Sequence, residues 1–533
     1  MNAFLLLMAI LVFASYFLKK LSRVLGIPVL LLFIVLGMVF GREGLFGIQF
    51  TNLALTEKLT SVALIFIMFY GGFGTNIRAA KPVLPESITL ASLGVVATSL
   101  LTSAFVYFVL HWDWPIAFLM GAVTSSTDAA SVFTILRSRN LGLKYNTASL
   151  LEVESGSNDP TAYMLTMIGV SLFMGQASMS GTAVMVLKQV GWGLFFGIAM
   201  AYLTRFLFDT LVDEGSGYDD LFIAGTAVIS YALPNLLGGN GYLSTYIAGV
   251  ILGNGTLRNK KALVNFFDGV TTFMQMVLFF LLGLVAVPSA VIRYFPEALI
   301  ITLFLTFVSR PVSTFLLMKP FKSPKNQIAL VSFSGLRGAA SIVFAIVAWQ
   351  QVGGDLPVVH VTFFLVLFSI LIQGSLLPRF AQKVDMVDEN VNNAKTFNDY
   401  TEEVPIQAIS FRLPDGHPWV GRTVAEVTFP PQTLATAIFR GHTRIVPNGE
   451  TRLEDGDVVT LAAHRSAKAP EEVEKMALTE INVEADDRYC GKRIAEIPMP
   501  KNTLITFIIR GDNVIVPDGD VRLEEDDVLV VSR

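Results

Sequence analysis

Long apolar segments, separated by short polar connections, occupy roughly the first 380 residues of the chain. About 20 apolar residues in helical form cross the hydrocarbon core of a bilayer. The pattern predicts about thirteen membrane-spanning helices, near residues 3–18, 26–41, 57–76, 83–110, 115–136, 148–174, 182–207, 219–235, 241–254, 263–287, 294–318, 326–350 and 356–378. Residues 1–383 are therefore predicted to form a polytopic α-helical membrane domain, and the polar residues 384–402 a linker.

The polar C-terminal region contains one sequence pattern twice, at a spacing of about 70 residues. Residues 421–427 (GRTVAEV), 445–449 (IVPNG) and 452–458 (RLEDGDV) match residues 491–497 (GKRIAEI), 515–519 (IVPDG) and 522–528 (RLEEDDV). Short β-branched runs bounded by Pro, Gly and Asp are typical of strands and hairpins, and a short helix is expected at 424–427 and in its counterpart. The pattern predicts two small α+β modules, at 403–466 and 479–533.

Basic residues collect in alternate connections between the predicted helices. Cytoplasmic connections are enriched in Lys and Arg, which predicts an outside N-terminus and a cytoplasmic C-terminal domain; an odd number of helices agrees with this. The acidic connection 209–220 is the exception. The basic residues are Lys19, Lys20, Arg23, Arg78, Lys81, Arg137, Arg139, Lys144, Arg258, Lys260, Lys261, Lys319, Lys322, Lys325, Arg379 and Lys383.

The composition agrees with a membrane protein and narrows its class. Hydrophobic residues make up 53% of the chain, charged residues 15%, and the mean hydropathy is +0.59. Residues 386–533 carry 26 acidic and 16 basic side chains, so this acidic tail argues against nucleic-acid binding, while the net positive membrane part suits an anionic lipid surface. The single Cys490 excludes an intramolecular disulfide and indicates a reducing compartment. The sequence contains neither a nucleophile elbow nor a phosphate loop, and we expect neither an enzyme nor a bound cofactor.

Residues 151–160 (LEVESGSNDP) place carboxylates inside, or at the mouth of, a predicted membrane helix. A charge at the centre of a bilayer costs on the order of 3 kcal/mol or more unless a cation, a cavity or a partner charge compensates it. On a helix, Glu154 and Asn158 lie one turn apart, as do Ser155 and Asp159. This segment is therefore predicted to form an ion site.

Two further polar segments interrupt predicted helices. Residues 124–131 (TSSTDAAS) and 332–341 (SFSGLRGAAS) contain hydroxylated residues or glycines that weaken a helix, and both end in Ala-Ala-Ser. Broken helices at corresponding positions of two inverted halves are the sequence signal of a transporter site. Arg337 needs an acidic partner there, and we assign Glu154 to it, which leaves Asp159 to face the cavity and exchange a proton for a cation.

These motifs carry a family resemblance. Segments 126–130 (STDAA), 154–160 (ESGSNDP) and 335–339 (GLRGA), with 26–28 (GIP) and 36–38 (LGM), resemble the monovalent cation:proton antiporter superfamily, in the branch of sodium/proton exchangers with an Asn-Asp pair. The resemblance covers nearly all of residues 1–380. It implies two inverted repeats with crossed broken helices, a homodimer, and electroneutral exchange of one cation for one proton.

The resemblance also implies roles for single residues. Asp159 would bind the cation and the proton in competition, with Asp128, Ser155 and the carbonyl of Thr127 as further ligands. Asn158 would steady the crossing of the broken helices. Glu154 and Arg337 match the family's structural ion pair, and Arg310 matches a further intramembrane arginine.

The two C-terminal repeats resemble the TrkA-C module, the C-terminal module of regulators of potassium conductance. This resemblance implies a regulatory tail that binds a small ligand of unknown identity. It favours K⁺ as the transported cation in a bacterial plasma membrane and a role in pH homeostasis, and Na⁺ or Li⁺ is the alternative. The sequence contains no carbonyl selectivity filter, which argues against a potassium channel gated by the tail. An ion sensor that moves no ions remains as a further alternative.

Overall fold

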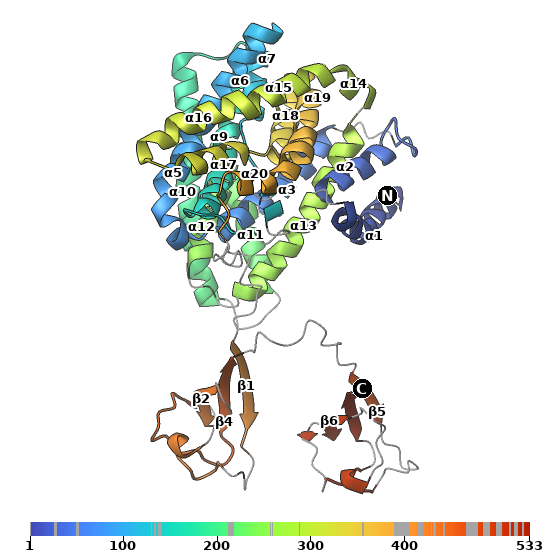
Figure 1. Ribbon diagram of the computed structural model, residues 1–533, viewed down its shortest axis with the longest axis vertical. Coiled ribbons are helices and arrows are strands. Elements are labelled where there is room, and N and C mark those ends of the chain that lie inside the picture. The colour runs from blue at the N-terminus through green and yellow to red at the C-terminus, as the bar shows by residue number, and fades with distance from the viewer. Residues whose placement is uncertain are drawn as a thin grey trace. The chain divides into compact units, whose positions relative to one another are not determined.

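The computed structural model of the chain contains two compact units, residues 1–402 and 403–533 (Figure 1). The structure describes residues 2–25, 29–48, 53–128, 131–132, 135–136, 141–211, 218–255, 257, 260–286, 288–353, 356–388, 406–413, 417, 419–427, 429, 433–440, 443–464, 478–482, 491–496, 504–510, 513–515, 521–524 and 527–532. Each unit is considered by itself below.

Helices build the first unit, and short π-helical segments at 90–94, 305–309 and 369–373 join some of them into longer rods. The helices are α1 (Asn2–Leu25), α2 (Val29–Phe40), α3 (Leu53–Gly74), α4 (Ile77–Ala80), α5 (Leu84–Thr89), α6 (Val95–Leu110), α7 (Trp114–Val123), α9 (Thr147–Phe173), α10 (Met179–Leu211), α11 (Tyr218–Leu236), α12 (Gly241–Asn254), α13 (Lys260–Val285), α14 (Pro288–Arg293), α15 (Phe295–Phe304), α16 (Arg310–Met318), α17 (Lys325–Phe333), α18 (Ala339–Val352), α19 (Pro357–Phe368) and α20 (Gly374–Lys383).

The described residues contain six helical stretches that are long and apolar enough to cross a membrane: Ala54–Gly74, Ile77–Leu110, Met179–Phe208, Ala262–Val285, Phe295–Phe321 and Pro357–Lys383. Three shorter apolar helices are Val29–Phe40, Trp114–Val123 and Ala339–Val352. Helix is present in each range predicted from the sequence. The first unit is thus a helical membrane domain.

The two predicted interruptions are present in the structure. α7 ends at Val123, and α17 and α18 are separated by residues 334–338. The hydroxyls of Thr124 and Ser125 donate to the carbonyls of Met120 and Ala122, both at 2.6 Å, and so take up acceptors at the end of α7. The N–H of Asp128 donates to the carbonyl of Leu336 at 2.8 Å. This bond joins the two interrupted segments.

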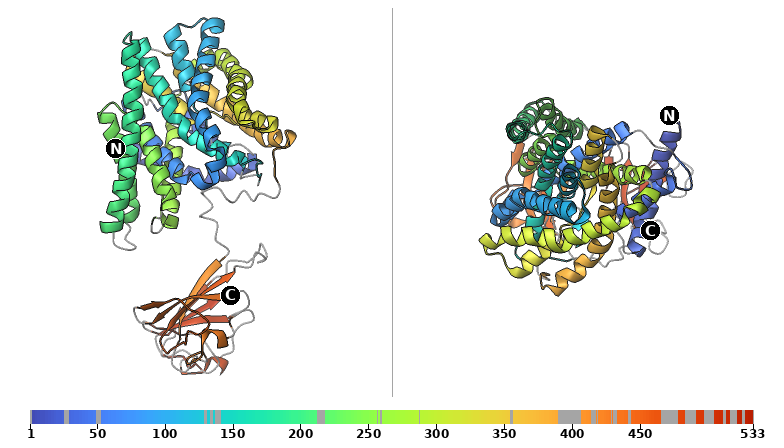
Figure 2. Two further views of the ribbon diagram at one scale, coloured as in Figure 1. Left: turned by 90° about the vertical axis from the view of Figure 1, so that its left-hand side faces the viewer. Right: turned by 90° about the horizontal axis from the view of Figure 1, so that it is seen from above.

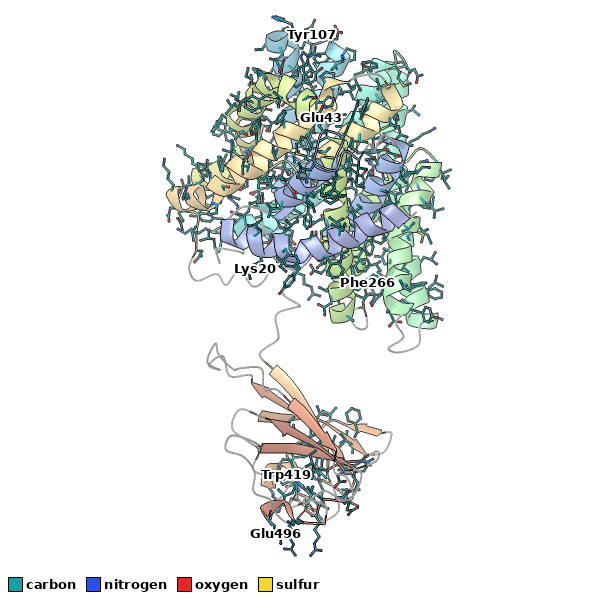
Figure 3. The ribbon with its side chains drawn as sticks, turned by 90° about the vertical axis from the view of Figure 1, so that its right-hand side faces the viewer. Lys20, Glu43, Tyr107, Phe266, Trp419 and Glu496 are labelled. Atoms are coloured by element: carbon teal, nitrogen blue, oxygen red, sulfur yellow. The ribbon has the colours of Figure 1, made fainter. Side chains whose placement is uncertain are left out.

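Helix α9 lies among other helices of the first unit, and it packs against α7, α18, α5 and α12. The long helix α10 runs along one side of the unit beside α11 and α12 (Figure 2). In Figure 3, Tyr107 and Glu43 lie in one half of this unit, and Lys20 and Phe266 lie in the other.

The described residues of the second unit form two four-stranded antiparallel sheets with the same topology, β1-β4-β2-β3 and β5-β8-β6-β7. The strands are β1 (Ile406–Arg412), β2 (Thr433–Arg440), β3 (Thr443–Ile445), β4 (Val458–His464), β5 (Leu478–Asn482), β6 (Leu504–Arg510), β7 (Asn513–Ile515) and β8 (Val528–Ser532). Short 3-10 helices occupy Val424–Glu426 and Ile494–Glu496. The predicted strands, short helices and internal repeat are therefore confirmed.

Each sheet carries the same charged cluster. Asp457, which is fully buried, accepts bonds from Nε and Nη2 of Arg440 at 2.9 Å, and Asp527 and Arg510 form the equivalent pair. Burial of Asp457 acts to raise its pKa, but the bonds from Arg440 and from the N–H of Glu454 outweigh it, so its pKa lies below the ordinary value. This pair should stabilise the first repeat at neutral pH.

We expect Asp457→Asn to lower the free energy of opening of β4 by about 2 kcal/mol at neutral pH, because a charge-assisted bidentate bond is lost while Arg440 keeps access to water. Because the pKa of Asp457 is lower in the folded than in the unfolded state, its ion pair stabilises the folded repeat at pH values above the unfolded-state pKa of about 3.9. This stabilisation is lost as the pH falls through the folded-state pKa of Asp457. Hydrogen–deuterium exchange of the full-length chain measures both effects. Glu454→Gln removes a carboxylate that is 56% exposed and should cost less than about 1 kcal/mol; an equal cost for both variants would contradict the assignment.

Candidate functional site

Helix α9 is continuous from Thr147 to Phe173, and it carries the predicted ion-site residues at the expected helical spacing. Glu154 and Asn158 are 1% and 0% exposed, and Ser155 and Asp159 are 7% and 8% exposed. Pro160 lies inside the helix, one residue beyond Asp159. Two carboxyl groups on one helix are thus enclosed by the membrane domain, where each requires compensation.

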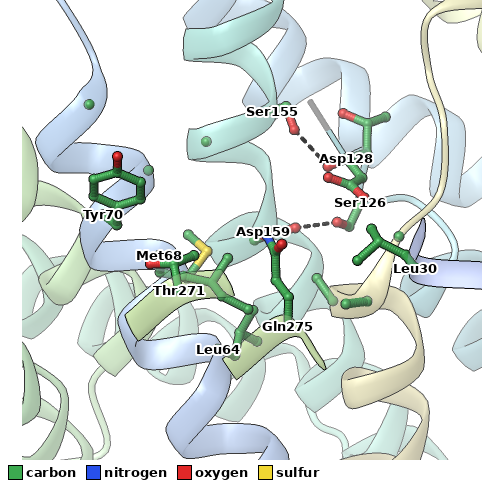
Figure 4. Close-up of a pocket in the computed structure, with 18 of the residues that line it drawn as sticks. Leu30, Leu64, Met68, Tyr70, Ser126, Asp128, Ser155, Asp159, Thr271 and Gln275 are labelled. Atoms are coloured by element: carbon green, nitrogen blue, oxygen red, sulfur yellow. Dashed lines mark hydrogen bonds between the residues drawn. The ribbon is translucent and has the colours of Figure 1, made fainter. Parts of the chain in front are cut away.

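A cavity of about 320 Å³ reaches Asp159 (Figure 4). Its wall includes Asp128, Ser155 and residues of α3 and α13, and Leu30 of α2 and residues 338–340 complete it, so distant segments of the chain meet at this place. Asp268 in α13 also lines the cavity and is exposed, which shows that the cavity reaches the protein surface. The predicted residues Asp128, Ser155 and Asp159 therefore line the same cavity.

Hydrogen bonds connect α9 to the interrupted segment that follows α7. The hydroxyl of Ser126 donates to Asp159 Oδ1, and Ser155 Oγ donates to the carbonyl of Thr127 at 2.8 Å, as the dashed lines in Figure 4 show. Asn158 Nδ2 donates to Thr127 Oγ1 at 2.5 Å. Asn158 thus helps to hold the segment that follows α7 beside Asp159.

Asp128 is held by its own chain and by the second interrupted segment. Its carboxylate accepts from the N–H of Ser131 at 3.2 Å and from Ser131 Oγ at 2.6 Å, as an N-cap aspartate does. A Cβ on Gly338 would lie 2.3 Å from Asp128 Oδ2 and 2.5 Å from its Cβ. Glycine at 338 is therefore required for the close approach of the two segments.

The assignment of Glu154 to Arg337 is wrong, because Glu154 pairs with Arg310. Arg310 Nη2 donates to Glu154 Oε1 at 2.7 Å, and both side chains are almost fully buried. The α17–α18 break leaves room for this arginine at Gly335, where a Cβ would lie 2.9 Å from Arg310 Nε. Arg310, predicted only as a further intramembrane charge, is thus the partner of Glu154.

Arg337 instead binds the carbonyls that the first interruption exposes. Its Nη1 donates to the carbonyls of Ser125 and Ser126, both at 2.7 Å, and its N–H donates to Ser369 Oγ at 2.9 Å. Carbonyls at a helix end carry partial negative charge, which a guanidinium compensates. Arg337 thus links the two interruptions.

The site offers oxygen atoms from carboxylates, hydroxyls and backbone carbonyls. Oxygen ligands suit hard cations such as alkali ions, whereas nitrogen and sulfur ligands suit transition metals. Among the described residues, no group of three or more His, Cys, Asp or Glu is arranged to hold a metal ion. The carboxylate of Asp159 at the inner end of a surface-connected cavity is suited to bind either a cation or a proton.

Sequence reasoning assigned no role to Ser126, Ser131 or Gly338, although all three lie in the quoted motifs. The spacing of Asp128 and Ser131 is that of an N-cap and its third following residue, which is readable from sequence. The contacts of Ser126 and Gly338 join segments far apart in the chain, and no local pattern predicts them.

Comparisons with known proteins give consistent results. The family model described as sodium/hydrogen exchanger, transmembrane, matches residues 8–383, and the TrkA-C domain model matches residues 408–468 and 478–532. The chain is 31% identical over 476 residues to the K(+)/H(+) antiporter NhaP2 of Shewanella baltica, covering 88% of this chain and 82% of that protein. It is 32% identical over 434 residues to the K(+)/H(+) antiporter NhaP of Alkalimonas amylolytica, covering 80% and 75%.

An archaeal relative connects the chain to a solved structure. The Na(+)/H(+) antiporter 1 of Methanocaldococcus jannaschii is 24% identical over 343 residues, covering 61% of this chain and 79% of that protein. The structure of the sodium proton antiporter MjNhaP1 from the same organism at pH 8 matches with a TM-score of 0.62 and 23% identity, over 71% of this chain and 97% of that chain. This structural likeness supports a common fold of the membrane unit.

Proposed function

Because the chain belongs to the sodium/hydrogen exchanger family, we propose that it is a secondary active antiporter that exchanges a monovalent cation, K⁺, for a proton across a membrane. The observation that carries the proposal is the position of Asp159, at the inner end of a surface-connected cavity and beside the crossing of two interrupted helices. Asp128, Ser155 and the oxygens of Thr127 are the further candidate ligands of the cation.

Competition for Asp159 explains coupling. A bare carboxylate is costly inside the membrane, so a site that carries this charge uncompensated resists movement to the other side. Binding of either a proton or a cation neutralises Asp159 and permits the movement. Since only one of them binds at a time, each cycle exchanges one cation for one proton, and the exchange is electroneutral.

The identity of the cation rests on the relatives and the tail. The two bacterial relatives with the highest coverage reported above are named K⁺/H⁺ antiporters, and this chain carries two TrkA-C domain matches. Na⁺ is the alternative, supported by the name of the more distant archaeal relative. The tail would regulate exchange by binding a small ligand whose identity stays open.

We further propose the membrane arrangement. The cavity is lined by the C-terminal half of α3 and by residues between 268 and 279 of α13, and the C-terminal end of α3 and the N-terminal end of α13 lead into connections that contain basic residues. By the distribution of positive charge, the cavity then opens to the cytoplasm. Thirteen spans in two inverted repeats, an outside N-terminus, a homodimer and a bacterial inner membrane complete the proposal.

Proton flux in proteoliposomes with an imposed pH gradient tests the function. K⁺ should dissipate the gradient, choline should not, and the apparent KM for K⁺ should rise up to about tenfold for each unit of falling pH under single-site competition. Flux should not depend on an imposed membrane potential. Activity with Na⁺ or Li⁺ alone would favour the alternative cation, and inactivity with every alkali cation would refute the antiporter.

We expect Gly338→Ala to raise the apparent KM for K⁺ by about ten- to a hundredfold, because its methyl group displaces Asp128 and small displacements at a site have effects of this size. Gly71→Ala is the matched control, since Gly71 lines the same cavity but a Cβ there would meet no atom within 4 Å. Concentration curves of K⁺-dependent proton flux compare the two variants. Equal KM values would show that the contact of Gly338 with Asp128 is unimportant.

A further inference from the structure

A second cavity lies on the outside of the membrane unit, away from the ion site. It has a volume of about 900 Å³ and lies between α16 with its preceding π-helical segment, α17, and α20. Its wall is almost entirely apolar, and Phe307 and Leu316 in it are 65% and 61% exposed. Helix α17 packs against both α16 and α20 and so forms the floor. We call this cavity the α17 groove.

Basic side chains border the α17 groove, and no acidic residue of the described part of the chain lines it. Lys325, Arg379 and Lys383 line the groove and are exposed. None of the three forms an ion pair within the described part of the chain. Lys325 is also the first residue of α17, so the positive end of that helix dipole lies at the same border. A long apolar surface thus ends at three positive charges that no described acidic residue pairs with.

We propose that the α17 groove binds one anionic phospholipid, with an acyl chain along the apolar wall and the phosphate group at Lys325, Arg379 and Lys383. Basic pockets between membrane helices on the cytoplasmic side suit anionic headgroups, and the sequence places all three residues in cytoplasmic connections. A zwitterionic lipid would leave the three charges without compensation. The groove volume lies within the range of about 300–1,000 Å³ that is usual for ligand sites.

The lipid would brace a helix that leads into the ion site. Phe333, the last residue of α17, lines the groove, and its ring stacks on Phe380 of α20 with 4.4 Å between centroids. Its carbonyl accepts from Gln373 Nε2 at 2.6 Å. Leu336, three residues later, accepts the bond from the N–H of Asp128. Occupancy should therefore raise the thermal stability of the folded protein by mass action.

Native mass spectrometry of the full-length protein, titrated with phosphatidylglycerol or with phosphatidylcholine of the same acyl chains, tests the proposal. Wild type should bind phosphatidylglycerol more tightly, and Arg379→Gln/Lys383→Gln should weaken this binding about tenfold or more, since each interfacial charge contributes on the order of fivefold. The matched control is Arg78→Gln/Lys81→Gln, which removes the same two side-chain types from another basic connection outside the groove. It should bind the lipid like wild type.

A second variant, Ala329→Phe, changes no charge but fills the groove, and it should also weaken phosphatidylglycerol binding and abolish the lipid-induced rise in melting temperature. Equal affinity of wild type for the two lipids would overturn the proposal. An equal loss of phosphatidylglycerol affinity in both double variants would also overturn it, because it would indicate unspecific attraction of the lipid to the positively charged protein surface. If Ala329→Phe instead converted an oligomer to monomers in the same spectra, the groove would be a contact between copies of the chain, and the lipid site would be refuted.

Discussion

Asp159→Asn should abolish cation-dependent proton exchange, with flux reduced at least about a hundredfold. The amide neither carries the charge that attracts the cation nor takes up a proton, so both competing ligands lose their common site. Two unit charges 4 Å apart at an effective dielectric constant of 20 attract each other by about 4 kcal/mol. Loss of an interaction of this size lowers the affinity for the cation by more than two orders of magnitude. The fold should persist, because the substitution is nearly isosteric and leaves an oxygen to accept from Ser126.

Asp268→Asn is the matched control, since it neutralises another carboxylate that lines the same cavity, at an exposed position. It should retain turnover at saturating K⁺. Proteoliposome flux for both variants, with melting temperatures to confirm folding, makes the comparison. Exchange by Asp159→Asn near the wild-type rate would contradict the site assignment, and loss of turnover in both variants would show that charge in the cavity, rather than this carboxylate, matters.

Glu154→Gln should destabilise the membrane unit by about 3–5 kcal/mol, because it leaves the buried guanidinium of Arg310 without its counter-charge. Lys144→Gln is the contrasting control: it breaks the ion pair with Asp385, whose side chain is 83% exposed, and should cost less than about 1 kcal/mol. Unfolding in mixed micelles gives both values.

A double-mutant cycle decides which arginine is the partner of Glu154. Adding Arg310→Gln to Glu154→Gln should cost little more than the single substitution, since removing both charges leaves neither member of this ion pair without its counter-charge. Adding Arg337→Gln should cost more, because Arg337 holds the carbonyls of Ser125 and Ser126. The opposite ranking would restore the pairing first expected from the sequence.

The sequence by itself determined the membrane class, the helical ranges, the two interruptions and the repeated tail. These features depend on local patterns: the length of an apolar run, the spacing of basic connections, and hydroxyls or glycines that weaken a helix. The grouping of Ser155 with Asp159 on α9 was also predictable, because residues four apart share a helix face.

Only the tertiary structure decided which distant groups meet. Glu154 had two buried arginines available in the sequence, and the packing of α16 against the break at Gly335 selects Arg310. The bond from Asp128 to Leu336, the contact of Ser126 with Asp159 and the groove over α17 all join segments that local patterns treat as independent. Hydropathy predicts that a segment crosses the membrane, but the identity of its neighbours is set by side-chain shape and charge across helices, which one-dimensional patterns do not contain.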